Sequence, residues 1–222
     1  MSNFNAQPAD LLSRFSSLNL KPEALEGLLD VAWRNVLLGQ SDFEDINEVL
    51  SEDELEEWGV DAAAATQVFK QVLEVRREQL KRAPAGLVPT QLTRAFDELN
   101  AKGIVARQNF SCCGSCAPGE IQEERTDESR GYVYFHVQDT ERLVEDRSTY
   151  LGYGVFHEAF WSEAEWDAMS RAEKDSAYEK ATLDLMNSIV LPTFKSHGIT
   201  VNWDGTLKTR IFIEGVDYIA QL

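Results

Sequence analysis

The chain has 222 residues, of which 43% are hydrophobic and 27% charged, so it can bury a sizeable core and does not have the composition of a disordered tail. Its 21 basic and 38 acidic residues give a formal net charge of -17, which argues against binding to nucleic acid or to an anionic membrane surface. No run approaches the roughly 18 apolar residues of a membrane span, and Met1–Leu20 lacks a secretory signal pattern, so we expect a soluble, cytoplasmic protein without a membrane partner.

The first part of the chain carries helical patterns. Apolar residues recur at helical spacing over Pro22–Leu38. A longer helix is predicted over Asp61–Arg82, and its basic C-terminal end (Arg76, Arg77, Lys81 and Arg82) suits the negative end of the helix dipole. The run Ala83–Pro89 contains two prolines and a glycine, which cannot continue a helix. We therefore predict a helical region over residues 1–83 and a second domain over residues 84–222.

This second domain mixes strands with helices. Runs rich in β-branched and aromatic residues predict strands over 104–110, 132–137, 149–156, 199–203 and 207–213. Helical patterns lie over 90–102, 118–124, 139–144 and 162–195, and the last is expected to be interrupted near Ser170. Asp204 and Gly205 predict a tight turn that joins the last two strands into a hairpin. This order predicts an α+β fold: an antiparallel sheet with helices on one face, in a ferredoxin-like (split βαβ) arrangement with an extra C-terminal hairpin strand.

All three cysteines lie in one cluster, Cys112, Cys113 and Cys116. An odd, clustered set is not a disulfide framework and favours a reducing compartment. The C-x-x-C spacing of Cys113 and Cys116 occurs in zinc knuckles and in redox dithiols. A zinc site needs four ligands, so Cys112 and a histidine, His136 or His157, would have to complete it. The alternative, which the sequence alone favours, is that small cysteines pack a tight turn and that the protein has no cofactor.

The most acidic stretch lies between Ser41 and Asp61, where ten acidic residues and no basic residue carry -10 of the net charge. Such a surface is suited to docking a basic protein, because long-range attraction speeds association. The alternative is a solvated helical face that keeps the protein soluble. The residues expected to bind a partner here are Asp42, Phe43, Glu44, Asp45, Glu48, Glu52, Asp53, Glu54, Glu56, Glu57 and Trp58, with Ile46 as a further apolar anchor.

A second candidate surface is the aromatic segment Phe156–Trp166, which holds four large aromatic residues. Trp161 and Trp166 are its candidate partner-binding residues, because exposed aromatic side chains are enriched at protein interfaces. The alternative is that these rings cover a face or an edge of the sheet. Within the preceding strand, Gly152 and Gly154 predict a bulge or a close backbone approach.

Several segments of the second domain resemble a family of uncharacterised bacterial proteins known as a domain of unknown function. They are Ala106–Phe110 followed by the cysteine cluster, Gly131–Glu141 (GYVYFHVQDTE), Tyr150–Gly154 (YLGYG) and Gly198–Ile213 (GITVNWDGTLKTRIFI). The resemblance implies family membership but no activity, so the chemistry has to be argued from the residues.

The sequence favours a non-enzymatic protein, since it contains no glycine-rich phosphate loop and no HExxH motif. We expect an acidic protein-binding protein, and by analogy of composition an immunity or inhibitor protein that neutralises a basic, nuclease-like toxin or effector. The alternative is a zinc- or thiol-dependent protein that uses the cysteine cluster with a nearby histidine.

Overall fold

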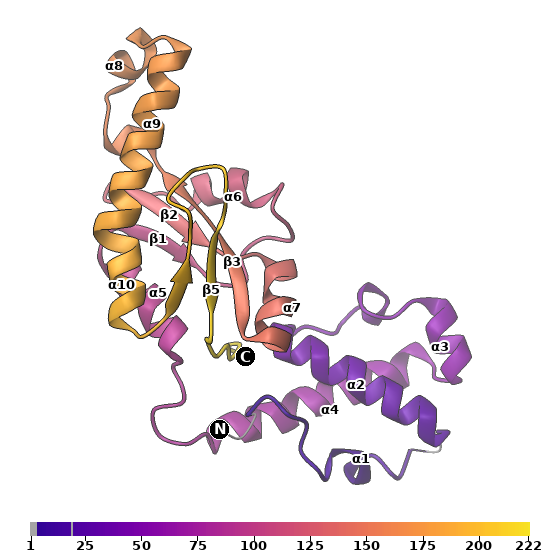
Figure 1. Ribbon diagram of the computed structural model, residues 1–222. Coiled ribbons are helices and arrows are strands. Elements are labelled where there is room, and N and C mark those ends of the chain that lie inside the picture. The colour runs from indigo at the N-terminus through magenta and orange to yellow at the C-terminus, as the bar shows by residue number, and fades with distance from the viewer. Residues whose placement is uncertain (1–3, 19) are drawn as a thin grey trace. The chain divides into compact units, whose positions relative to one another are not determined.

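The computed structural model describes residues 4–18 and 20–222 and divides into two units (Figure 1). The first unit comprises Met1–Val88 with Ile219–Leu222, and the second comprises Pro89–Tyr218. In the part of the chain that the structure describes, no helix combines the length and the apolar character needed to cross a bilayer.

The first unit is helical. Its elements are α1 (Leu11–Arg14), α2 (Pro22–Leu38), the 3-10 turn η1 (Ile46–Glu48), α3 (Glu52–Trp58) and α4 (Ala62–Lys81). The apolar stripe predicted for Pro22–Leu38 is confirmed, because it is buried where α2 packs against α4. A left-handed Gly39 ends α2, and Asp61 caps α4 by accepting a hydrogen bond from the backbone N–H of Ala64.

Arg76 departs from the expected exposed basic end of α4, because its side chain is only 1% exposed. Its guanidinium donates to the carbonyl oxygen of Phe4 at 3.0 Å and to Oδ1 of Asn5 at 2.7 Å. It also lies over the rings of Phe4 and Trp33, at 5.0 and 5.7 Å from their centroids. Burial lowers the pKa of Arg76 to about 10. Arg76 therefore joins the start of the chain to the helical core instead of complementing a helix dipole in solvent.

The second unit contains all the strands of the described residues. Its elements are α5 (Gln91–Ala101), β1 (Ile104–Arg107), α6 (Ala117–Glu123), β2 (Gly131–Tyr134), α7 (Val137–Asp146), β3 (Ser148–Val155), η2 (His157–Ala159), α8 (Glu163–Ala168), α9 (Arg171–Leu185), the π-turn η3 (Met186–Val190), α10 (Leu191–Ser196), β4 (Thr200–Asn202) and β5 (Ile211–Glu214).

The strands form one sheet in the order β1-β2-β3-β5-β4. β1 and β2 are parallel, and each other neighbouring pair is antiparallel. The α+β fold class is confirmed. The strand order, however, differs from the expected ferredoxin-like one: β1 and β2 are direct neighbours, so the βαβ unit is not split, and the sheet is mixed instead of wholly antiparallel.

Helices cover both faces of the sheet, not one face as expected. On one face, Phe96 of α5 packs against Phe135 and against Phe194 of α10. On the other face, α6 packs its Ala117 and Ile121 against Tyr132 and Tyr134 of β2. The physical reason is the parallel β1–β2 pair, because parallel neighbours require a crossover connection over one face, and residues 108–130 carry α6 in that crossover.

Two tyrosines of β2 lie opposite two glycines of β3. The register pairs Tyr132 with Gly154 and Tyr134 with Gly152. A Cβ atom at Gly152 would lie 2.5 Å from the Tyr134 ring, and one at Gly154 would meet the hydroxyls of Tyr132 and Tyr178. The close approach predicted for these glycines is therefore made by aromatic side chains.

The β4–β5 hairpin is confirmed, but its turn is wider than a two-residue Asp-Gly turn. β5 begins at Ile211, so residues 203–210 form a loop where a strand was predicted from residue 207. Asp204 organises this loop by accepting hydrogen bonds from the backbone N–H of Thr206 at 3.0 Å and from the hydroxyl of Thr209 at 2.6 Å. The loop keeps Lys208 and Arg210 out of the sheet.

Candidate functional site

The three cysteines lie together on the turn between β1 and α6. Their sulfur atoms all lie within 4.8 Å of one another, and those of Cys112 and Cys113 are 3.7 Å apart. Cys112 and Cys116 are exposed, Cys113 is half-buried, and all three thiols are free. Three sulfurs at this separation can hold a metal ion.

The chain segment that leads into this turn has an unusual backbone. Asn109 and Ser111 both have positive φ angles, of 52° and 64°, which are rare for residues with a side chain. The turn is held to the end of β2, because Phe110 donates its backbone N–H to the carbonyl of Phe135 at 2.9 Å, and Val137 donates to the carbonyl of Ser111 at 3.2 Å. Residues held in such conformations concentrate at functional sites.

The surroundings of the cluster give Cys113 and Cys116 different pKa values. Backbone N–H groups of Cys116 and Ser115 donate to the sulfur of Cys113 and lower its pKa to about 7. Hydrogen bonding with the sulfurs of Cys112 and Cys113 raises the pKa of Cys116 to about 11, and repulsion from their negative charge adds to this shift. Cys113 therefore ionises at a lower pH than Cys116.

His136 lies beside the cysteine turn but outside the group of sulfur atoms. It follows β2 and caps α7: its Nδ1 accepts from the backbone N–H of Asp139 at 3.3 Å, and its Nε2 lies 3.0 Å from Oδ2 of Asp139. A Cβ atom at Gly114 would lie 3.4 Å from Nε2 of His136, which shows how closely the turn approaches the ring. The strand predicted over 132–137 included His136, but β2 ends at Tyr134; His136 caps α7 instead, and its side chain is only 8% exposed.

Asp139 links His136 to Arg210, which sequence reasoning missed. Arg210 donates to both carboxylate oxygens of Asp139 and, at 2.7 Å, to the carbonyl of Tyr150. Burial lowers the pKa of His136, while the Asp139 carboxylate opposes that shift. Asp139 and Arg210 are separated by 71 positions in the chain, so no local sequence pattern could predict their contact.

The acidic stretch of the first unit is fully presented to solvent, since all ten of its acidic side chains are exposed. Four of them also fix the local backbone by accepting its N–H groups: Asp42, Asp45, Glu54 and Asp61. The expected apolar anchors are placed differently. Phe43 and Ile46 are 1% and 2% exposed and belong to the core, and Trp58 is half-buried against Gly27.

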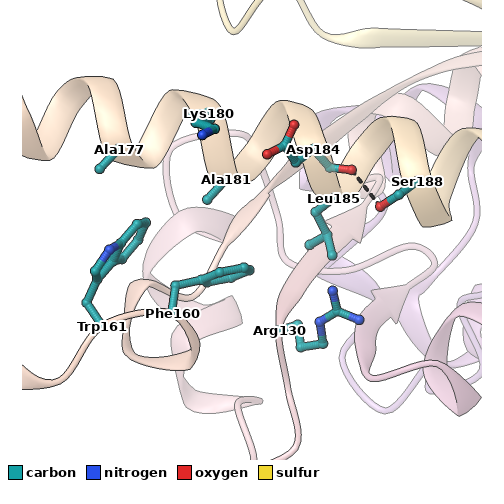
Figure 2. A pocket seen from close by; sticks show the side chains of 9 residues that line it. All are labelled: Arg130, Phe160, Trp161, Ala177, Lys180, Ala181, Asp184, Leu185 and Ser188. Atoms are coloured by element: carbon teal, nitrogen blue, oxygen red, sulfur yellow. Dashed lines mark hydrogen bonds between the residues drawn. The ribbon is translucent and has the colours of Figure 1, made fainter.

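The aromatic segment follows β3 and forms a row of neighbouring, tilted rings. His157 lies 4.6 Å from Trp166, and Trp166 lies 5.1 Å from Trp161, measured between ring centroids. Figure 2 shows Phe160 and Trp161 directed toward one side of α9, where they enclose a cavity of about 320 Å³ with Ala181. Phe160 and Trp161 thus line an open pocket beside α9, and partner binding by Trp161 and Trp166 stays a prediction.

The comparisons with known proteins assign a family and no activity. A family model described as "Domain of unknown function (DUF6891)" matches residues 21–220. The match includes the helical first unit, whereas the resemblance visible in the sequence began at Ala106. Neither the comparison with curated proteins nor that with solved structures found a match.

Proposed function

The chain belongs to the family described as a domain of unknown function (DUF6891), and we propose from its side chains that it binds Zn²⁺ through the thiolates of Cys112, Cys113 and Cys116. The observation that carries this proposal is the grouping of three free sulfur atoms within 4.8 Å. Sulfur ligands at about 2.3 Å from a tetrahedral zinc lie roughly 3.8 Å apart, close to the separation of Cys112 and Cys113. Soft thiolate ligands favour zinc over magnesium or calcium.

The lowered pKa of Cys113 supports the proposal, because a metal ligand has to be deprotonated. A bound cation would also offset the hydrogen bonding and the repulsion that raise the pKa of Cys116, so all three sulfurs would bind as thiolates. The sequence suggested His136 or His157 as the fourth ligand, but Nε2 of His136 is held by Asp139, and His157 is not grouped with the sulfurs among the described residues. We therefore assign three protein ligands to this site and leave its fourth position to water.

The experiment is a zinc titration of the full-length protein, freed of metal under reducing conditions, against a chromophoric chelator. We expect one Zn²⁺ per chain, and absorption bands of thiolate coordination when Co²⁺ replaces it. Cys113→Ser should lose stoichiometric binding. Ser115→Ala is the matched control: it alters the same turn but keeps the backbone N–H that donates to Cys113, so its binding should match the parent protein.

His136→Gln separates the two ligand sets. With three cysteine ligands and water, this variant binds zinc as the parent does. A large loss of affinity would instead make His136 the fourth ligand, and an absence of stoichiometric zinc from the parent protein would contradict the proposal as a whole. Circular dichroism of each variant shows whether the fold is retained.

A second candidate function is the one that composition favours, the binding of a basic protein such as a nuclease-like toxin or effector. The observation in its favour is the exposure of all ten acidic side chains between Ser41 and Asp61. Only four of them accept the local backbone bonds described above. Charges that make no such bond are free to attract a basic partner over long range.

This candidate is tested with a variant that removes charge and keeps the caps. Glu48, Glu52, Glu56 and Glu57 are changed together to glutamine, while Glu120, Glu123, Asp127 and Glu128, exposed in the second unit, are neutralised in a matched control. Affinity purification from cells that naturally make the protein should retain one basic polypeptide at low salt and release it as salt rises. Retention by the control but not by the first variant supports the candidate; equal retention by both contradicts it.

A further inference from the structure

A cavity of about 390 Å³ lies on the α6 side of the sheet, entirely within the second unit. Four tyrosines line it: Tyr132 and Tyr134 of β2, Tyr153 of β3 and Tyr178 of α9. The wide β4–β5 loop forms another wall and contributes Lys208 and Arg210. Its size falls within the range of small-molecule sites in proteins, and its wall has the usual composition of such sites, mostly ring surface with a few polar groups.

The charge of this cavity is opposite to that of the protein. The chain carries 38 acidic residues, but none of them is among the described residues that line the cavity. Lys208 and Arg210 both line it. Arg210 is paired with Asp139, so its charge is already balanced. No acidic side chain of the described residues forms an ion pair with Lys208. The cavity therefore offers one unbalanced positive charge, which favours a ligand with one negative charge.

The tyrosine rings are held in a fixed arrangement. Tyr132 and Tyr134 stack with an interplanar angle of 23° and a centroid separation of 6.1 Å, and the opposing glycines of β3 leave room for them. Tyr153 is fixed by the loop, because its hydroxyl donates to the carbonyls of Thr206 and Thr209 and accepts from Nε1 of Trp203. Parallel rings with little freedom of movement suit a flat, apolar ligand body.

The hydroxyl groups supply hydrogen-bond donors. The hydroxyls of Tyr132 and Tyr178 lie 3.5 Å apart, so one donates to the other and the second keeps its hydrogen for a ligand. Burial raises the pKa of Tyr132 and Tyr134, so these hydroxyls stay protonated at neutral pH. A protonated hydroxyl donates to a carboxylate and does not repel it.

We propose that this cavity binds a small aromatic carboxylate, with the ring of the ligand against the tyrosines and its carboxylate toward Lys208. The proposal does not depend on the zinc site, although Gly114 of the cysteine turn also lines the cavity. It assigns a role to the wide β4–β5 loop and to the Tyr-Gly pairs, which neither the zinc site nor the acidic surface uses.

The experiment measures benzoate binding to the full-length protein by saturation-transfer NMR and calorimetry, with benzamide as a neutral probe of the same shape and inorganic phosphate as an anion without a ring. We expect saturable binding of benzoate, with benzamide and phosphate weaker by about tenfold. Lys208→Gln should weaken benzoate about fivefold, because it removes one exposed charge. Tyr178→Phe should also weaken it, because it removes a donor hydroxyl and keeps the ring.

Lys180→Gln is the matched control, since Lys180 lines the separate cavity of Figure 2. It should leave benzoate binding unchanged. Three results would overturn the proposal: no saturable binding of benzoate, equal binding of benzamide, or an equal loss in both lysine variants. Cys113→Ser keeps benzoate binding while it loses zinc, so failure of this proposal and failure of the zinc proposal are distinguishable.

Discussion

Tyr134 lies directly opposite Gly152 in the β2–β3 pair, and its ring covers the backbone of that glycine. The position has no room for a side chain, because a Cβ atom at Gly152 would lie 2.5 Å from the ring. The same ring packs against α6 and lines the tyrosine cavity. One cross-strand pair therefore connects the order of the sheet with the shape of the cavity lined by the four tyrosines.

Gly152→Ala is expected to destabilise the protein by about 1–3 kcal/mol, the usual cost of overpacking a well-packed site. Urea denaturation followed by circular dichroism measures the change. Gly119→Ala is the control: it adds the same methyl group within α6, where a Cβ atom meets nothing within 4 Å, and should be neutral or stabilising by up to about 1 kcal/mol. Equal effects of the two substitutions would refute the steric argument.

Arg76→Gln should cost about 2–4 kcal/mol, because it leaves the carbonyl of Phe4 and the amide of Asn5 without their buried donor. Thermal and urea unfolding measure the loss. Arg77→Gln, one position along the same helix, removes only an exposed pair with Glu74 and should change stability by less than about 1 kcal/mol. A similar, small effect of both variants would show that the contacts of Arg76 contribute little.

The stability of the protein should decrease as the pH falls below the ordinary histidine pKa of 6.5, because burial lowers the pKa of His136 in the folded state. The unfolded chain then binds a proton that the folded chain does not, and the free energy of unfolding drops until the pH reaches the folded-state pKa of His136. Protonation also removes the Nδ1 acceptor that caps α7.

Urea midpoints at pH 7.5 and pH 5.5, about one unit on either side of the ordinary histidine pKa, measure how stability depends on pH. His136→Asn should flatten it, while His157→Asn, at a half-exposed histidine, should retain it. If the slope of stability against pH were the same in the parent and in His136→Asn, other groups would be responsible.

Alkylation of the metal-free protein by iodoacetamide should begin at Cys113 and follow a midpoint near pH 7, since the backbone N–H groups of Ser115 and Cys116 stabilise its thiolate. Cys116 should react only at much higher pH. Peptide mass spectrometry after timed alkylation identifies the modified residue at each pH. In urea all three thiols should titrate near their ordinary pKa of about 8.5, and a midpoint that stayed near 7 there would show that the fold is not its cause.

The helices could be predicted from the sequence, because the interactions that specify them span only a few residues. The apolar stripe of Pro22–Leu38 and the break in the helix near Ser170 are both present in the structure. The cysteine cluster, too, could be recognised as a candidate metal site from its spacing alone. The close approach at Gly152 was predictable in kind, although the ring that fills the space was not.

Other parts of the site could not be predicted, because they depend on residues far apart in the chain. Asp139 and Arg210 are 71 positions apart in the chain, and they fell within a predicted helix (139–144) and a predicted strand (207–213). The tyrosine cavity depends on α9 and on the β4–β5 loop meeting the same face of the sheet. The hydrophobic periodicity of a strand indicates which residues share a face of the sheet, but it does not indicate which strand lies beside it.

By itself, the sequence determined the helices, the α+β class, the acidic surface and the cysteine cluster, since each depends on composition or on residues close in the chain. Only the tertiary structure decided that β1 and β2 are parallel neighbours, that Arg76 is buried, and that an acidic protein contains a cavity with no acid among the described residues that line it. Strand partners and buried charges are selected by packing over the whole unit, where many weak contacts compete, and no short segment contains that information.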